Sequence, residues 1–209
     1  MYIPKYSEVH DLKLIKSFVE EYSFATLLSQ TSEGISANHY PFLIDQEGED
    51  LVLWTHLALG NPQWKSLSQT MKALVIFTGP HSYISPVYYK DPLNVPTWSY
   101  TAVHATCACE VVKDSQVTKD LMKRLVNHYE RKNGTNWNYE LPEDFHEQLL
   151  KAIVWLKLRV TSVEAKFKLS QNRDKEDYLG VIEEFSKRTS ENDKDLLRYM
   201  KLTMPEKMK

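Results

Sequence analysis

Residues 74–104 constrain the fold of this chain more than any other stretch. The stretch opens with the apolar run LVIF (74–77), whose length and β-branched residues predict a buried strand. Gly79-Pro80 is expected to break that strand, after which Tyr83 and Ile84 alternate with polar residues, as in a strand with two different faces. Residues 91–96 contain two prolines and predict a stiff, extended loop that leads into a second strand.

The predicted strand ends and loop carry aromatic rings, hydroxyls and two imidazoles, His81 and His104. Such a mixture suits a flat polar heterocycle, because rings stack on its faces and hydroxyls bind its edge. Tyr83 and Trp98 are candidates for flanking such a ring system. The alternative is an ordinary sheet core, which composition alone favours because large aromatic side chains are mostly buried.

Composition indicates a soluble globular protein with one substantial domain or a domain with an appendage: the chain has 209 residues, of which 42% are hydrophobic. The formal charge of -2 gives no overall electrostatic case for nucleic-acid binding. Cys107 and Cys109 would share one face of a strand, which is poor disulfide geometry, so we expect free thiols in a reducing cytoplasm. No signal peptide or run of membrane-spanning length is visible.

The rest of the chain predicts about six strands in antiparallel meander order, with helices between and after them. The further strands are expected at residues 24–31, 35–45, 51–56, 97–112 and 153–168. Helices are expected at residues 11–22, 62–71, 114–131, 142–152, 177–187 and 193–200, followed by a frayed tail at 202–209. This order predicts a β-rich α+β fold, an antiparallel barrel with peripheral and C-terminal helices.

Four polar clusters fall at predicted strand ends, at residues 38–41, 56–64, 79–83 and 168–173. Each is weak alone, since Asn61-Pro62 is more often a helix cap and a histidine at a strand end is more often structural. A barrel would bring them together, and the helix after the second cluster would offer backbone N–H groups to a phosphate. No carboxylates lie at metal-ligand spacing, and neither cysteine has an activating base, so neither a metal site nor a catalytic residue is assigned.

The same clusters resemble the PaiB family, the FMN-binding negative transcriptional regulators of bacteria. The resemblance spans nearly the whole chain and is carried by MYIP (1–4), HYP (39–41), HLA (56–58), NPQW (61–64), FTGPHSYISP (77–86), VPTWSY (95–100), AVH (102–104) and KLSQNR (168–173).

The resemblance implies a split antiparallel β-barrel, the FMN-binding split barrel, acting as a cytoplasmic homodimer with FMN at the dimer interface. It implies a barrel domain over residues 1–170 and a C-terminal helical appendage over 171–209. The loop from His56 to Asn61 would approach the phosphate, and Trp98 and Tyr100 would close the site over the flavin ring. The implied cofactor-binding residues are His39, His56, Asn61, Trp64, Phe77, Gly79, His81, Ser82, Tyr83, Ile84, Trp98 and Tyr100.

Three functions stay open at this point. The first is an FMN-binding transcriptional regulator, since Bacillus members of the family are linked to repression of sporulation and degradative-enzyme genes. Direct DNA contact would need a basic patch, for which the candidates are Lys119, Lys123, Arg124, Arg131 and Lys132. The second is a flavin-dependent oxidoreductase acting on a small molecule. The third is a cofactor-free dimeric interaction module.

Overall fold

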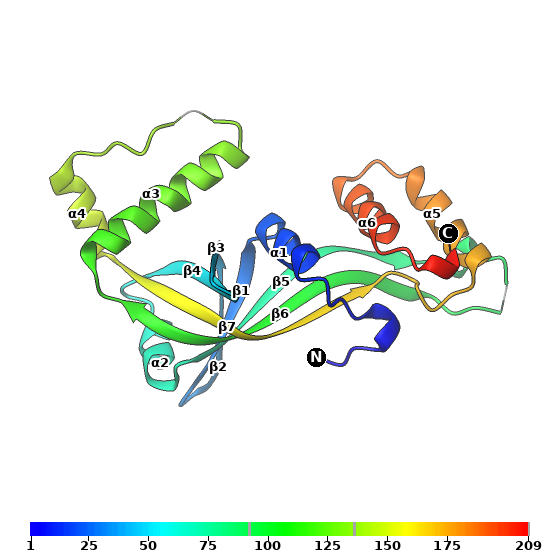
Figure 1. The fold of residues 1–209 in the computed structure, drawn as a ribbon, viewed down its shortest axis with the longest axis horizontal. Coiled ribbons are helices and arrows are strands. Elements are labelled where there is room, and N and C mark those ends of the chain that lie inside the picture. The colour runs from blue at the N-terminus through cyan, green and yellow to red at the C-terminus, as the bar shows by residue number, and fades with distance from the viewer. Residues whose placement is uncertain (92, 136, 209) are drawn as a thin grey trace. The chain divides into compact units, whose positions relative to one another are not determined.

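The computed structural model describes residues 1–91, 93–135 and 137–208. Its strands are β1 (Phe24–Thr31), β2 (Gly34–Pro41), β3 (Leu43–Glu47), β4 (Asp50–Ala58), β5 (Lys72–Ile84), β6 (Thr97–Val112) and β7 (Ile153–Lys168). Its α-helices are α1 (Leu12–Glu21), α2 (Gln63–Thr70), α3 (Ser115–Lys132), α4 (Glu143–Lys151), α5 (Lys175–Ser186) and α6 (Glu191–Leu202) (Figure 1). Pro92, which belongs to the predicted loop, lies outside the described residues.

All seven strands belong to one sheet, in the order β2-β1-β5-β6-β7-β4-β3. The chain divides into two compact units. Unit 1 comprises residues Met1–Phe18, Thr78–His104 and Glu164–Lys209, and unit 2 comprises Val19–Phe77 and Ala105–Val163. The strands β5, β6 and β7 each contribute residues to both units. The predicted domain boundary at residue 171 stays a prediction.

Unit 2 is built from two antiparallel hairpins, β1–β2 and β3–β4, and β4 also pairs antiparallel with β7. Its core contains two tryptophans, Trp54 of β4 and Trp155 of β7, which pack with Leu121 and Leu125 of α3. The helix begins one residue after the predicted start, because the Asp114 side chain accepts hydrogen bonds from two backbone N–H groups of its first turn. Each described helix is too short or too polar to span a membrane.

The single strand predicted over residues 35–45 is wrong, because the structure has two strands there. One ends at Pro41 and pairs with β1, and the other begins at Leu43 and pairs with β4. Between them Phe42 is fully buried, and its backbone N–H donates to the Ser23 carbonyl. These two strands stand at opposite ends of the sheet order, so the connection is not the simple meander that the sequence predicts.

In unit 1 the sheet is covered on one side by helical residues. Phe18 of α1, Phe167 of β7 and Tyr199 of α6 form an aromatic cluster with ring centroids 5.0 to 5.6 Å apart. Helices α5 and α6 lie side by side (Figure 1). The Tyr178 hydroxyl of α5 donates to the Met200 carbonyl of α6 at 2.7 Å and fixes the two helices together. These contacts make the C-terminal helical hairpin an integral part of the unit.

The tail predicted to fray does not do so over its described part. Residues Glu206–Met208 form a 3-10 turn, in which the Met208 N–H donates to the Pro205 carbonyl. The Met208 side chain is only 2% exposed. Burial of the Met208 side chain orders this segment, although its mostly polar sequence predicts fraying.

The predicted break at Gly79-Pro80 is also wrong, since β5 runs through both residues. Gly79 permits a close approach, because a Cβ there would lie 2.5 Å from both the Phe18 ring and Thr101 Oγ1. Pro80 needs no partner for a backbone N–H, and its carbonyl accepts from Thr101 Oγ1 at 3.2 Å. Both residues are buried, so the alternation of buried and exposed residues along β5 shifts by one, as in a β-bulge.

We predict that Gly180→Ala destabilises the protein. In a helix interior this change normally stabilises by about 1 kcal/mol. Here a Cβ would lie 2.2 Å from the Tyr88 carbonyl oxygen, which belongs to the backbone and cannot rotate away. We expect the free energy of unfolding in urea to fall by about 1–3 kcal/mol.

The control for this change is Gly60→Ala, because a Cβ at Gly60 meets nothing within 4 Å. It should alter stability by less than about 0.5 kcal/mol. A Gly180→Ala protein at least as stable as the wild type would contradict the packing described here.

Candidate functional site

One face of the sheet in unit 1 carries exposed aromatic rings. His81 and Tyr83 project from β5, and Trp98 and Tyr100 project from β6; we call these four residues the aromatic face. The rings of His81 and Trp98 are stacked, with centroids 5.8 Å apart and an interplanar angle of 29°. Tyr83 meets Trp98 edge-on at 6.2 Å. Trp98 is 49% exposed and Tyr83 48%, although large aromatic side chains are usually buried.

Two lysines of β7 lie beside the aromatic face. Lys166 Nζ is 5.3 Å from the centroid of the Tyr100 ring, a cation–π contact. Lys168 Nζ donates to Thr97 Oγ1 at 2.6 Å. Burial lowers the pKa of Lys168, and the positive charges of Lys166 and Arg173 act in the same direction. An anion at this place would relieve the mutual repulsion of the three cations.

Three other predicted site residues support β5 rather than reach its exposed face. Gly79 admits the Phe18 ring, as described above, and Ile84 is fully buried. The Ser82 hydroxyl accepts a hydrogen bond from Arg188 Nη1 at 3.2 Å. These three residues therefore hold the strand from behind the exposed rings.

In unit 2, Asn61 belongs to a network of hydrogen bonds that fastens α2 to the β1–β2 hairpin. Its Nδ2 donates to the Tyr40 hydroxyl at 2.9 Å, and its Oδ1 accepts from the Gln63 backbone N–H at 3.0 Å. Gln63, only 1% exposed, accepts from Tyr40 and Asn38 and donates to the Leu27 carbonyl. Both ends of the Asn61 amide are thus engaged within the protein.

Other predicted residues of unit 2 also make contacts of their own. Trp64 Nε1 donates to the Leu59 carbonyl at 2.9 Å, and the His39 ring stacks on Phe24 with centroids 6.3 Å apart. Phe77 is fully buried.

His56 differs from these residues. Its ring centroid lies 5.0 Å from that of Trp155, and burial lowers its pKa. In the described part of the chain, the buried His56 Nδ1 and Trp155 Nε1 have no hydrogen-bond partner. Two such atoms on paired residues of neighbouring strands leave a donor and an acceptor unused.

The structure thus brings together His81, Tyr83, Trp98 and Tyr100, and it assigns His39, His56, Asn61, Trp64 and Phe77 to the other unit. Sequence reasoning from the residues did not single out Lys166. Its signal is the alternation along β7, which places Lys166 and Lys168 on the same face.

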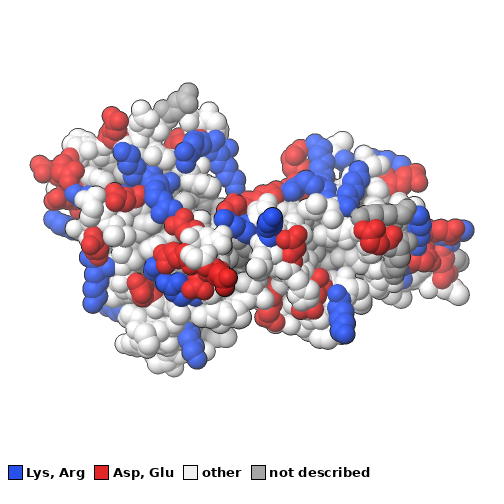
Figure 2. Space-filling model, in the orientation of Figure 1, with Lys and Arg blue, Asp and Glu red and all other residues white. Residues whose placement is uncertain are grey.

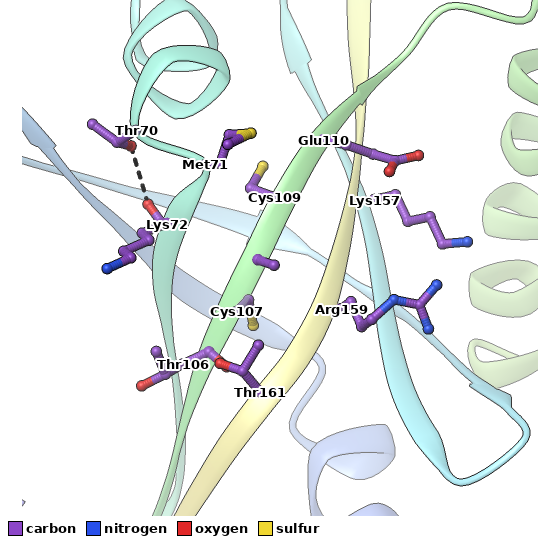
Figure 3. A pocket seen from close by; sticks show the side chains of 11 residues that line it. Thr70, Met71, Lys72, Thr106, Cys107, Cys109, Glu110, Lys157, Arg159 and Thr161 are labelled. Atoms are coloured by element: carbon purple, nitrogen blue, oxygen red, sulfur yellow. Dashed lines mark hydrogen bonds between the residues drawn. The ribbon is translucent and has the colours of Figure 1, made fainter.

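Unit 2 also contains a hollow of about 600 Å³ over β6 and β7 (Figure 3). Two of the three cations that line it are already paired, because Lys157 Nζ lies 2.8 Å from Glu47 and Arg159 Nη1 lies 2.8 Å from Asp50. Cys107 and Cys109 are free thiols, as predicted. Burial raises the pKa of each to about 12, so neither is an activated nucleophile. The described residues contain no group of three potential metal ligands.

Comparisons with known proteins agree with this architecture. A family model described as "Putative FMN-binding domain" matches residues 1–162. The Bacillus subtilis protein named "Protease synthase and sporulation protein PAI 2" is 35% identical over 201 residues, which cover 96% of each chain.

Two solved structures share the fold. The flavocytochrome Anf3 of Azotobacter vinelandii superposes with a TM-score of 0.60 at 14% identity, covering 85% of this chain and 78% of that one. The conserved hypothetical protein Rv2991 of Mycobacterium tuberculosis gives 0.56 at 11% identity, covering 83% and 94%. With the antiparallel seven-stranded sheet, these matches confirm the predicted split-barrel fold class.

We predict that neither thiol reacts readily in the folded protein. At neutral pH a thiol with a pKa of about 12 is almost entirely protonated, and both cysteines are buried. Ellman's reagent should therefore react slowly with the native protein and rapidly with two thiols after unfolding in guanidinium. Rapid native reaction of either thiol would show that the β6 side chains are accessible.

We also predict that His56 contributes to acid sensitivity. Its pKa is lowered in the folded state, so the unfolded chain binds more protons once the pH falls below the ordinary histidine value of about 6.5. Stability is therefore complete above that value and decreases below it. His56→Gln should lose less unfolding free energy than the wild type between about pH 7.5 and about pH 5.

The control for this measurement is His10→Gln, because the His10 side chain is 80% exposed. This variant should follow the wild type across the range. An equal loss of unfolding free energy in wild type and His56→Gln would remove His56 from the acid response.

Proposed function

Because the chain belongs to the PaiB family of FMN-binding domains, we propose that it is an FMN-binding regulator of gene expression whose flavin lies on the aromatic face of unit 1. The observation that carries the proposal is the exposed stack of His81 and Trp98 beside the partly buried Lys168. The family match is the one that the sequence motifs predict, and it makes FMN the cofactor to test on these residues.

The residues of this face fit the two chemical parts of FMN. The flat isoalloxazine ring needs apolar surfaces to stack on, and Trp98, His81 and Tyr83 present exposed rings. The phosphate needs donors and positive charge, which the partly buried Lys168 supplies from β7, while the buried Lys166 donates to the Tyr2 carbonyl and adds positive charge nearby. When bound, FMN supplies a redox-active ring, and the chain's own residues hold and orient it.

This proposal narrows the set of ring-contacting residues predicted from the sequence. The polar groups of Asn61 and Trp64 are hydrogen-bonded within unit 2, and Gly79 and Ile84 are buried. We therefore do not propose these four residues as flavin contacts. The predicted flavin contact of His56, which belongs to unit 2, is not part of this site and is tested separately by His56→Ala, because its Nδ1 has no partner in the part of the chain that the structure describes. We also propose that the protein is a cytoplasmic homodimer, as the family resemblance implies.

The regulatory part of the proposal is supported by the Bacillus subtilis relative, whose name refers to protease synthesis and sporulation and which matches almost end to end. Three of the five basic residues of α3 that are candidates for DNA contact already have partners, and one of them, Lys132, donates to the Glu21 carbonyl at 2.8 Å. Lys119 is paired with Glu143 and Glu147, and Arg124 is paired with Asp45. On the face drawn in Figure 2, Lys and Arg are interspersed with Asp and Glu. We therefore assign no operator-reading role to α3.

The test is titration of the purified protein with FMN, followed by quenching of flavin fluorescence. Trp98→Ala should weaken FMN binding about tenfold, the magnitude expected for the loss of one stacked ring. Trp137→Ala is the matched control, because Trp137 is also 49% exposed but belongs to unit 2. Failure of the wild type to bind FMN, or equal weakening by both substitutions, would overturn the proposed site.

Two further measurements on the same purified protein distinguish a regulator from an oxidoreductase. A salt-sensitive, sequence-selective gel shift, or an effect of the gene on protease production, supports the regulator. Steady turnover of a reduced nicotinamide by the FMN-loaded protein, without an effect on gene expression, would replace it with a flavin-dependent oxidoreductase.

A further inference from the structure

The helical hairpin α5–α6 holds the edge of β5 next to the aromatic face. We infer that Asn192 and Arg188 are positioning residues that fix His81 and Ser82 and thereby set the geometry of the flavin-stacking rings. This inference rests on the proposed function, because it takes the aromatic face to be the flavin site. Both residues lie beyond residue 162, where the family match ends.

The Asn192 side chain makes the two hydrogen bonds with the His81 backbone that a neighbouring strand would otherwise make. The His81 backbone N–H donates to Asn192 Oδ1 at 3.1 Å, and Asn192 Nδ2 donates to the His81 carbonyl at 2.8 Å. In an antiparallel ladder one residue exchanges both hydrogen bonds with the residue opposite. A side-chain amide carries the same donor and acceptor as a peptide, so Asn192 makes that exchange in place of a strand.

Arg188 holds the following residue of β5 and the turn after it. Its Nη1 donates to Ser82 Oγ at 3.2 Å, and its Nη2 donates to the Tyr88 hydroxyl at 2.8 Å. The guanidinium carbon lies 4.1 Å from the centroid of the Phe185 ring. The side chain is therefore sandwiched between its own hairpin and the strand that it holds.

The hairpin is itself rigid, which a positioning element requires. The Ser190 hydroxyl caps α6 by accepting from the Asp193 N–H at 3.2 Å. Asp193 Oδ1 lies 3.6 Å from Arg188 Nη1. The Tyr199 ring anchors the other end of the helix in the cluster with Phe18 and Phe167. Asn192 in the first turn of α6 is thus presented from a fixed support.

His81 connects Asn192 to the aromatic face. His81 is bonded by its backbone to Asn192, and its ring stacks on Trp98. Without the Asn192 amide, β5 keeps its pairing with β6 and the Arg188 hydrogen bond at Ser82, but it loses two hydrogen bonds at His81, so the spacing of the two rings is less tightly held. Asn192 therefore affects flavin binding through the position of His81.

The test compares Asn192→Ala with Glu191→Ala, a neighbour in the same turn of α6 whose side chain is 86% exposed. The first readout needs no flavin: hydrogen exchange of the His81 amide in the free protein. Exchange should accelerate about tenfold in Asn192→Ala and stay unchanged in Glu191→Ala. Near-UV circular dichroism of Trp98 should weaken in Asn192→Ala for the same reason.

The second readout is FMN affinity, which should fall about three- to tenfold in Asn192→Ala and not in Glu191→Ala. Asn192→Asp keeps the acceptor but sets a carboxylate oxygen against the His81 carbonyl, so it should weaken FMN binding at least as much as Asn192→Ala. If the His81 amide of Asn192→Ala exchanges at the wild-type rate, the two hydrogen bonds from Asn192 do not hold β5 and the inference is wrong. Faster exchange with unchanged FMN affinity would make Asn192 structural only and overturn the positioning role. A wild type that binds no FMN would refute the proposed function. The exchange measurement would still test whether Asn192 holds the His81 backbone.

Discussion

The fold and the candidate site depend on how Gly79 and Pro80 are packed. Both residues are buried in succession, so the strand changes which of its residues face the core. Before them the odd-numbered residues Val75 and Phe77 are buried; after them Ile84 is buried and Tyr83 is exposed. Without this shift Tyr83 would point into the core. The Phe18 ring, which fits only against a glycine, therefore determines that the aromatic face exists.

The sequence predicts the long elements well because their signals are local. The strands Thr97–Val112 and Ile153–Lys168 have the predicted bounds, and α3 begins one residue after the predicted start, with Asp114 as its N-cap. The errors arise where a distant contact outweighs a local signal. Gly79-Pro80 resembles a turn, yet Phe18 and Thr101 keep it in a strand. At Phe42, burial and a hydrogen bond to Ser23 redirect the chain, and the neighbouring Pro41 is the one local signal that a single strand does not continue there.

The same distinction separates the parts of the candidate site. Tyr83 and Trp98 can be selected from the sequence, because aromatic residues near prolines and hydroxyls suggest a ligand. The simpler interpretation of Asn61-Pro62 as a helix start agrees with the structure, in which Pro62 is the N-cap residue of α2 and the Gln63 N–H donates to Asn61 Oδ1. Asn192 is beyond sequence reasoning, because its partner His81 lies 111 residues away and contributes only backbone atoms. Backbone hydrogen bonds leave no residue-type signal at the strand they serve.

The site also divides along the chain by chemical role. The exposed rings of β5 and β6 lie within residues 1–162, which define the family. Lys166 and Lys168 near the end of β7, Asn192 of α6 and Arg188 just before that helix lie after residue 162. In our proposal, stacking on the flavin ring thus belongs to the matched domain, whereas phosphate charge and rigidity come from the segment that follows. A fragment that stops at residue 162 would keep the ring-stacking side chains and lose the hydrogen bonds that fix His81.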